Sequence, residues 1–323
     1  MKVMTAHIIF ESYKGLQAFA IVRPNGVHIE SGYELLTDRA TIVLPRNVPD
    51  FDKKNVKDVF VKGRPVTIQL GYNGDNVTEF TGYITRVSAD MPIKIELEDE
   101  MYQLKKLPVH LSTKSIGLPD FIKKIVPGYK TDVADWQMPT QRHIHTTAAK
   151  VLDYLKSEYN LFSYFKGKTL VVGKIYDDDA GEPVKLHLEQ NTKSRANDLK
   201  YRDKDEVLIK IKAVSTLHNG QKIEVEVGDD NGTEQRLSYY GIEVKAELKK
   251  AAQRDYDKYK VSGFDGSLTT FGQPYISHGM RVTLESDQYP DRNGTYYVDK
   301  VSVDWDDSSG YQRKLELGKK ADG

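Results

Sequence analysis

The sequence contains no cysteine. This absence excludes disulfide bonds, thiolate nucleophiles and zinc sites built on cysteine. Long apolar runs are also absent, since no stretch approaches the roughly 20 residues that a membrane-spanning helix needs. Residues 1–10 carry one lysine and lack the apolar core and cleavage site of a signal peptide. We therefore expect a chain that is made in a cytoplasm and has no stable membrane anchoring.

An excess of charge of either sign is missing as well. Lys and Arg number 47, Asp and Glu also number 47, and the formal net charge is +0. A balanced surface gives no long-range attraction for nucleic acid or for acidic membranes. We expect no sequence-specific nucleic-acid binding.

Residues 1–105 have the pattern of short β-strands. Apolar and polar residues alternate over 39–44 and 65–70, and Asn73-Gly74 is typical of a tight hairpin turn. Many short strands joined by regular turns favour a small β-barrel. The first predicted domain is therefore a β-barrel over 1–105.

Residues 106–185 change character. A short helix is predicted over 119–126, and a clearer one begins after Thr146 or Thr147 and ends near Asn160. A hairpin turning at Lys166-Gly167 follows. Helices packed on small sheets make this segment an α+β insert.

From residue 186 to 323 the strand pattern resumes. Strands are expected over 207–214 and 222–227, and a linking helix over 244–258. The predicted fold is α+β and mainly β: two related small β-barrels, 1–105 and 186–323, flank the α+β insert.

The word "related" refers to an internal repeat. Three pairs of segments occur in the same order with similar gaps: Lys62–Ile68 with His278–Leu284, Gly82–Ser88 with Tyr296–Ser302, and Ile93–Leu97 with Arg313–Leu317. A repeated order of this kind indicates a duplicated unit.

Two motifs could bind a metal. His143 and His145 alternate in an extended segment, which would place both imidazoles on one face, but no third ligand follows at a fixed distance. Asp177–Asp179 could hold Ca²⁺, but the EF-hand pattern with its later glutamate is missing. A strand before a helix and a solvated turn explain these motifs better, so we predict no metal site.

Tyrosines and lysines also gather locally. Tyrosine clusters can bind sugars or bases but are common in strands and interfaces; they are Tyr239, Tyr240, Tyr256, Tyr259, Tyr296 and Tyr297. The basic residues of the last helix alternate with acids, as on a solvated face; they are Lys245, Lys249, Lys250, Arg254 and Lys258. No Ser/His/Asp set, phosphate-binding loop or HExxH motif is present. We predict no catalytic and no cofactor-binding residue.

The C-terminal part resembles a known family. The segments Thr270–Val282, Gly294–Val301 and Gly310–Gly318 are similar to the final barrel of phage tail hub proteins, namely the late control protein D and Mu-type baseplate hubs. The order barrel, insert, helix, barrel covers nearly the whole chain, although the chain is somewhat short for the family.

The resemblance implies a structural role in a phage-type contractile tail. Such hubs are homotrimers whose barrels form a pseudo-sixfold ring between the tail tube protein and the central spike protein. It also implies a place in the virion tail baseplate after synthesis in the bacterial host. Two alternatives stay open: a tail-associated cell-wall hydrolase, which needs a carboxylate pair in a cleft, and a tail-tip carbohydrate-binding module, which needs exposed aromatics.

Overall fold

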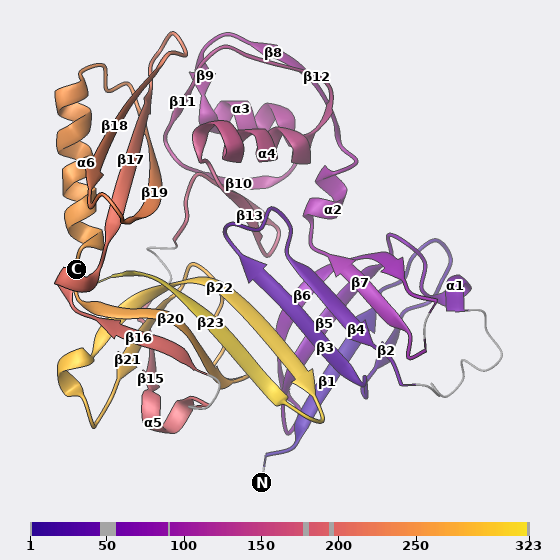
Figure 1. The fold of residues 1–323 in the computed structure, drawn as a ribbon. Coiled ribbons are helices and arrows are strands. Elements are labelled where there is room, and N and C mark those ends of the chain that lie inside the picture. Colours follow the sequence, from indigo (N-terminus) through magenta and orange to yellow (C-terminus); the bar gives the residue numbers. More distant parts are fainter. Residues whose placement is uncertain (1, 46–55, 90, 177–180, 194–196, 322–323) are drawn as a thin grey trace.

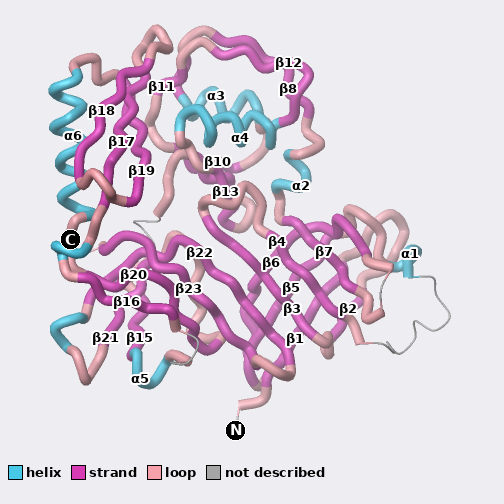
Figure 2. The backbone as a smooth tube through the Cα atoms, in the orientation of Figure 1, coloured by secondary structure: helices cyan, strands magenta, loops and turns pink. Residues whose placement is uncertain are grey.

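The computed structural model describes residues 2–45, 56–89, 91–176, 181–193 and 197–321. Most of the described backbone is strand, with a few helices (Figures 1 and 2), so the mainly β class is confirmed. A single thirteen-stranded sheet contains strands from both ends of the chain. No helix in these described ranges is long and apolar enough to cross a membrane.

The first set of strands comes from the N-terminal segment and includes a short helix, α1 (Val56–Val59). The strands are β1 (Met4–Phe10), β2 (Phe19–Ile21), β3 (Gly26–Gly32), β4 (Arg39–Val43), β5 (Pro65–Tyr72), β6 (Asp75–Val87) and β7 (Lys94–Glu98). Buried residues alternate with partly exposed ones along most of β1, β4 and β5, as the sequence predicted for half-buried strands.

The second set comes from the C-terminal segment and includes α5 (Leu188–Asn191) and two 3₁₀ turns, Lys204–Glu206 and Pro290–Arg292. Its strands are β15 (Val184–His187), β16 (Asp198–Arg202), β20 (Gly263–Phe271), β21 (Arg281–Glu285), β22 (Gly294–Asp306) and β23 (Gly310–Lys320). The two sets join where β22 pairs with β3.

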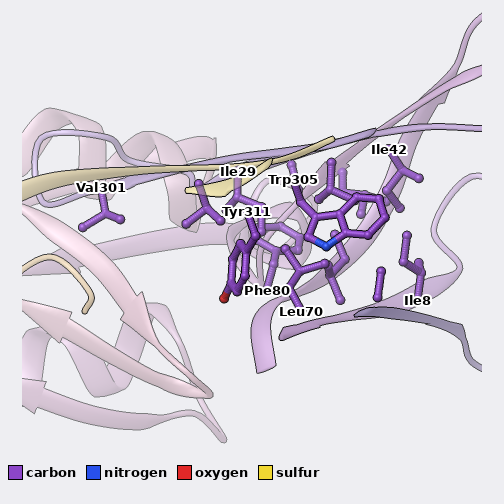
Figure 3. Packing of buried hydrophobic residues seen from close by; sticks show 14 of the residues in the cluster. Ile8, Ile29, Ile42, Leu70, Phe80, Val301, Trp305 and Tyr311 are labelled. Carbon is purple, nitrogen blue, oxygen red and sulfur yellow. The ribbon is translucent and has the colours of Figure 1, made fainter. Parts of the chain in front are cut away.

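One apolar cluster serves both sets. It contains Ile8 and Leu70 from β1 and β5, Ile42 from β4, and Trp305 and Tyr311 from β22 and β23. Figure 3 shows the Trp305 indole lying among these side chains. Because the sheet curls over this cluster, burial of apolar surface holds the two ends of the chain together.

The insert lies above the sheet in Figure 1 and has its own core. Its elements are α2 (Met101–Leu104), β8 (Pro108–Thr113), β9 (Ile116–Gly117), α3 (Leu118–Ile125), β10 (Lys130–Val133), β11 (Gln137–Met138), β12 (Gln141–Thr147), α4 (Ala148–Tyr159), β13 (Ser163–Lys166) and β14 (Thr169–Val172). Thr147 caps α4, and Asn160 ends it with a φ of 57°. Met101 and Leu104 of α2 belong to this core.

A further compact unit lies within the C-terminal segment. Its elements are β17 (Ile209–Thr216), β18 (Lys222–Gly228), β19 (Thr233–Tyr240) and α6 (Lys245–Tyr259). The helix packs on β17 and β18 through Leu248 and Ala252. Trp136 of the insert contacts Tyr240 of this unit, with ring centroids 5.2 Å apart. The predicted helix is thus part of a small sheet-and-helix unit, which the sequence pattern did not reveal.

Candidate functional site

The duplicated strands begin with the same backbone hydrogen bonds. The Gly63 N–H donates to the Ile84 carbonyl at 2.7 Å, and the Gly279 N–H donates to the Val298 carbonyl at 2.7 Å. Ile84 and Val298 each donate back to the residue after the glycine, at 3.0 and 2.9 Å. Both glycines have positive φ, 86° and 82°, a conformation that glycine adopts without steric cost. The first two segment pairs of the repeat therefore match residue for residue.

The third segment pair matches too. The pairing of β6 with β7 skips Thr85, and the pairing of β22 with β23 skips Asp299, so both units have a bulge at the same place. A cation then faces a glutamate in each unit: Arg86 with Glu96 at 3.5 Å, and Lys300 with Glu316 at 3.9 Å.

The match extends to the order of six strands in each set, while β2, which pairs with β1, has no counterpart among the described strands of the second set. In the first set the order is β1-β5-β6-β7-β4-β3, and in the second it is β15-β21-β22-β23-β20-β16. One pair differs in direction, because β1 runs antiparallel to β5 while β15 runs parallel to β21. Each chain thus carries two units of the same connectivity, hereafter the N-unit (β1–β7) and the C-unit (β15, β16 and β20–β23).

The junction between the N-unit and the C-unit is an antiparallel pairing of β3 with β22. On its exposed face, His28 and Asp304 lie 2.6 Å apart, and Lys300 contacts Glu30 at 3.3 Å. The hydrogen bond that the His28 ring donates to the Asp304 carboxylate raises the pKa of His28. These partly exposed pairs set the register more than the stability, because solvent screens them.

A buried ion pair links the N-unit and the C-unit on the inner side of the sheet. Arg313 of the C-unit donates to the Glu79 carboxylate of the N-unit at 2.6 Å, and the two side chains are 1% and 2% exposed. Arg313 also donates to the carbonyls of Gly272 and Ile276, and the Tyr311 hydroxyl donates to Glu79. Burial is the main cause that raises the pKa of the Tyr311 hydroxyl, and the charge of Glu79 raises it further.

Sequence reasoning missed this pair, although one signal was present. Arg313 lies between Tyr311 and Leu315 on the core-facing side of β23, where an apolar residue is the rule. Glu79 is the extra residue of a bulge in the pairing of β5 with β6, and no local pattern indicates which way its side chain points.

A second polar group lies where the N-unit, C-unit and insert meet. Ser31 and His278 Nδ1 are 2.7 Å apart, and the His278 ring packs against Tyr164 of the insert. Burial lowers the pKa of His278 to about 4. Burial also raises the pKa of Asp38 to about 7, and it raises that of the neighbouring Asp99. This group is a structural junction with suppressed charge rather than an open cleft.

The two candidate metal-binding histidines have different surroundings. A bulge interrupts β12 after His143, and His145 has a φ of 52°, so the expected regular alternation fails. His143 contacts Phe121 and Tyr154, whereas His145 contacts His110. Within the described ranges no group of three His, Asp or Glu could hold a metal. Asp177–Asp179 lie outside the described residues.

The clustered tyrosines pack inside the chain. Tyr296 is buried and its hydroxyl accepts from the Phe264 N–H at 2.9 Å, while Tyr297 stacks on Tyr176 of the insert at 4.0 Å. The Tyr239 hydroxyl donates to Asp255 at 2.5 Å. These contacts agree with the structural interpretation of the tyrosines. On α6, Lys258 pairs with the same Asp255 at 3.0 Å.

A shallow pocket of about 420 Å³ opens beside β12 and the start of α4. Arg142, His143, Lys150 and Tyr154 contribute to its wall, and no carboxylate lines it. Burial lowers the pKa of His143, which favours the neutral imidazole. The pocket therefore lacks the pair of carboxylates that glycoside hydrolysis uses.

Comparisons with known proteins identify the class of fold. No family model matches the sequence, and no curated protein matches it. Among solved structures, a tail protein from Neisseria meningitidis has a TM-score of 0.62 at 17% identity, covering 99% of this chain and 97% of that chain. The 43 kDa tail protein of prophage MuSo2 from Shewanella oneidensis has a TM-score of 0.59 at 16% identity, covering 96% and 97%.

The likeness extends beyond phages. A component of the E. coli type VI secretion system, itself similar in structure to bacteriophage T4 tail proteins, has a TM-score of 0.55 at 11% identity, covering 97% of this chain and 76% of that chain. The chain therefore has the fold that these phage tail and type VI secretion proteins share. The resemblance inferred from the sequence is confirmed at the level of fold.

Proposed function

We propose that this protein is the baseplate hub of a phage-type contractile tail, a homotrimer that joins the sixfold tail tube to the threefold central spike. The observation that carries the proposal is the duplicated unit. Because the N-unit and C-unit share their connectivity, three copies present six similar units to a sixfold partner. The insert and the unit formed by β17–β19 and α6 occur once per chain, so they keep threefold symmetry for the spike.

The remaining features support a structural role. The two units share the same backbone pairing and the same bulge, and a buried ion pair links them; all of these features fix shape. Each unit, in this proposal, acts as a small barrel-like block of the ring in the virion tail baseplate. Head-to-tail contacts between unlike surfaces close such rings.

The test is a mass measurement of the purified protein over a range of concentrations, followed by electron microscopy of the largest species. We expect a trimer that strengthens with concentration, with six similar densities in its ring and threefold features above it. Tube and spike proteins should stabilise it by mass action. A stable dimer, or a ring without six similar densities, would contradict the proposal.

A further inference from the structure

The duplication specifies which strands of the two units are equivalent. In the N-unit, Thr41 of β4 lies between Glu96 of β7 and His28 of β3. In the C-unit, Ser267 of β20 lies in the same way between Glu316 of β23 and Asp198 of β16. Residues 28–32 of the N-unit therefore correspond to residues 198–202 of the C-unit. Likewise, β6 from Arg86 onward corresponds to β22 from Lys300 onward.

One of the two equivalent junctions is formed within the chain. β22 accepts β3 along residues 300–306. Among the described residues, the corresponding edge of β6 has no strand beside it, since its pairing with β5 ends at Tyr83 and the last hydrogen bonds found on that side involve Ile84. β16, the counterpart of β3, is the last strand of the sheet order and has a neighbour on one side only among the described strands.

We propose that β16 of one copy pairs antiparallel with β6 of a neighbouring copy, in the register of the β3–β22 junction. Arg86 then lies opposite Arg202 of the neighbouring copy, Val87 opposite Tyr201, and Ser88 opposite Lys200. This assignment rests on the proposed homotrimer and names the edges that form its interface. Unpaired strand edges are templates for such pairing.

The side chains at both edges fit this pairing. Val87 and Leu199 are partly buried residues packed on the main apolar cluster at its two ends, so the pairing would extend that core into the next copy. Arg86 already forms an ion pair with Glu96, and Arg202 forms one with Asp265, with a guanidinium nitrogen and a carboxylate oxygen 2.8 Å apart. The two facing arginines therefore each arrive with a carboxylate, which offsets their repulsion.

The pairing also closes. Each copy contributes one β16 and accepts one, so the contacts run head to tail, and three copies complete a ring of six units. The apolar cluster lies on the inner side of the curled sheet, where Ile8 of β1 and Leu70 of β5 lie across the cluster from Ile29 of β3 (Figure 3). In a closed ring the outside has the larger circumference, so the bulkier side of each unit, which holds the apolar cluster, β1 and β5, faces outward. The opposite face of the sheet then lines the channel. That face carries the balanced pairs His28–Asp304 and Lys300–Glu30.

The absence of native cysteine makes the interface testable by engineered disulfides. Directly opposed residues of antiparallel strands have Cα atoms about 4.5–5.5 Å apart, within disulfide range. The double variant Val87→Cys/Tyr201→Cys, oxidised at high protein concentration, should give a covalent closed trimer on a non-reducing denaturing gel. The matched control Ser31→Cys/Val301→Cys occupies the equivalent place inside one chain and should give only an intramolecular bond.

A second control tests the register. Val87→Cys/Leu199→Cys shifts the pair by two residues to about 7–8 Å, too far for efficient bonding. If Val87→Cys/Tyr201→Cys fails to fold by circular dichroism, Ser88→Cys/Lys200→Cys places the same test on a partly exposed and an exposed position.

The outcomes separate the two proposals. Covalent trimers from the aligned pairs, with few from the shifted pair, support the interface. A trimer by mass measurement without these cross-links overturns the β16–β6 pairing and leaves the hub proposal standing. A protein that stays monomeric and uncross-linked at every concentration overturns both.

Discussion

Replacing Arg313 by methionine should destabilise the joined sheet by about 3–5 kcal/mol, because the Glu79 carboxylate would remain buried without its cation. The two side chains are almost fully enclosed, so water cannot take the place of the guanidinium. Methionine keeps much of the side-chain volume, which limits any contribution from a cavity. The carbonyls of Gly272 and Ile276 would also lose their donor.

The double variant Arg313→Met/Glu79→Leu separates these contributions. It removes both charges, so its loss should be smaller than the sum of the two single losses, with a coupling of about 1–3 kcal/mol. The residual loss should be about 1–3 kcal/mol, because the two carbonyls still lack a donor.

The assay is urea unfolding followed by tryptophan fluorescence. Trp305 lies in the apolar cluster of the sheet and Trp136 in the insert, so a Trp136→Phe background leaves a reporter for the sheet alone. Lys212→Met is the control, because Lys212 pairs with Glu224 at 3.6 Å in a partly exposed position and should cost less than about 1 kcal/mol. If Arg313→Met costs no more than this control, or if the cycle shows no coupling, the argument from burial is refuted.

Four further predictions concern the buried polar group around His278, the insert and the structural role. Asp38→Asn should gain stability relative to the wild type as pH rises from 4 to 8. Burial raises the pKa of Asp38 to about 7, so the wild type loses stability as this carboxyl ionises, whereas the amide does not ionise. Urea midpoints at several pH values check this, and a constant difference would contradict it. His278 acts in the opposite sense between pH 4 and 6.5, since its pKa is lowered to about 4 and the neutral ring is favoured on folding, so His278→Gln should flatten the rise of stability over that range. Replacing residues 107–181 by a flexible linker should leave a soluble β-rich product by circular dichroism. Met101 and Leu104, which are buried in the core of the insert, would become exposed and need polar substitutions. Complete loss of soluble protein would count against independent folding of the strand units. Purified protein should not cleave peptidoglycan, and reproducible cleavage that one carboxylate substitution abolishes would overturn the structural assignment.

Local patterns in the sequence determined much of the secondary structure. The helix α4 begins after Thr147 and ends at Asn160, as predicted, and the helix expected over 244–258 is α6, Lys245–Tyr259. The repeat was also visible, because a duplicated strand pattern conserves its glycine and its alternation, and the structure shows the same hydrogen bonds at Gly63 and Gly279. These features depend on residues close in the chain, so sequence pattern reports them directly.

Only the tertiary structure decided how the units join. The β3–β22 pairing brings together residues that are distant along the chain, such as His28 and Asp304, and the Arg313–Glu79 pair likewise links the two ends of the chain. The bulge that turns Glu79 inward and the bulge that separates His143 from His145 each alter the direction of side chains that strict alternation would place otherwise. Alternation indicates which face of a strand is buried, but the partner of a strand edge is chosen by backbone groups that every residue carries, and so it leaves no trace in the local sequence.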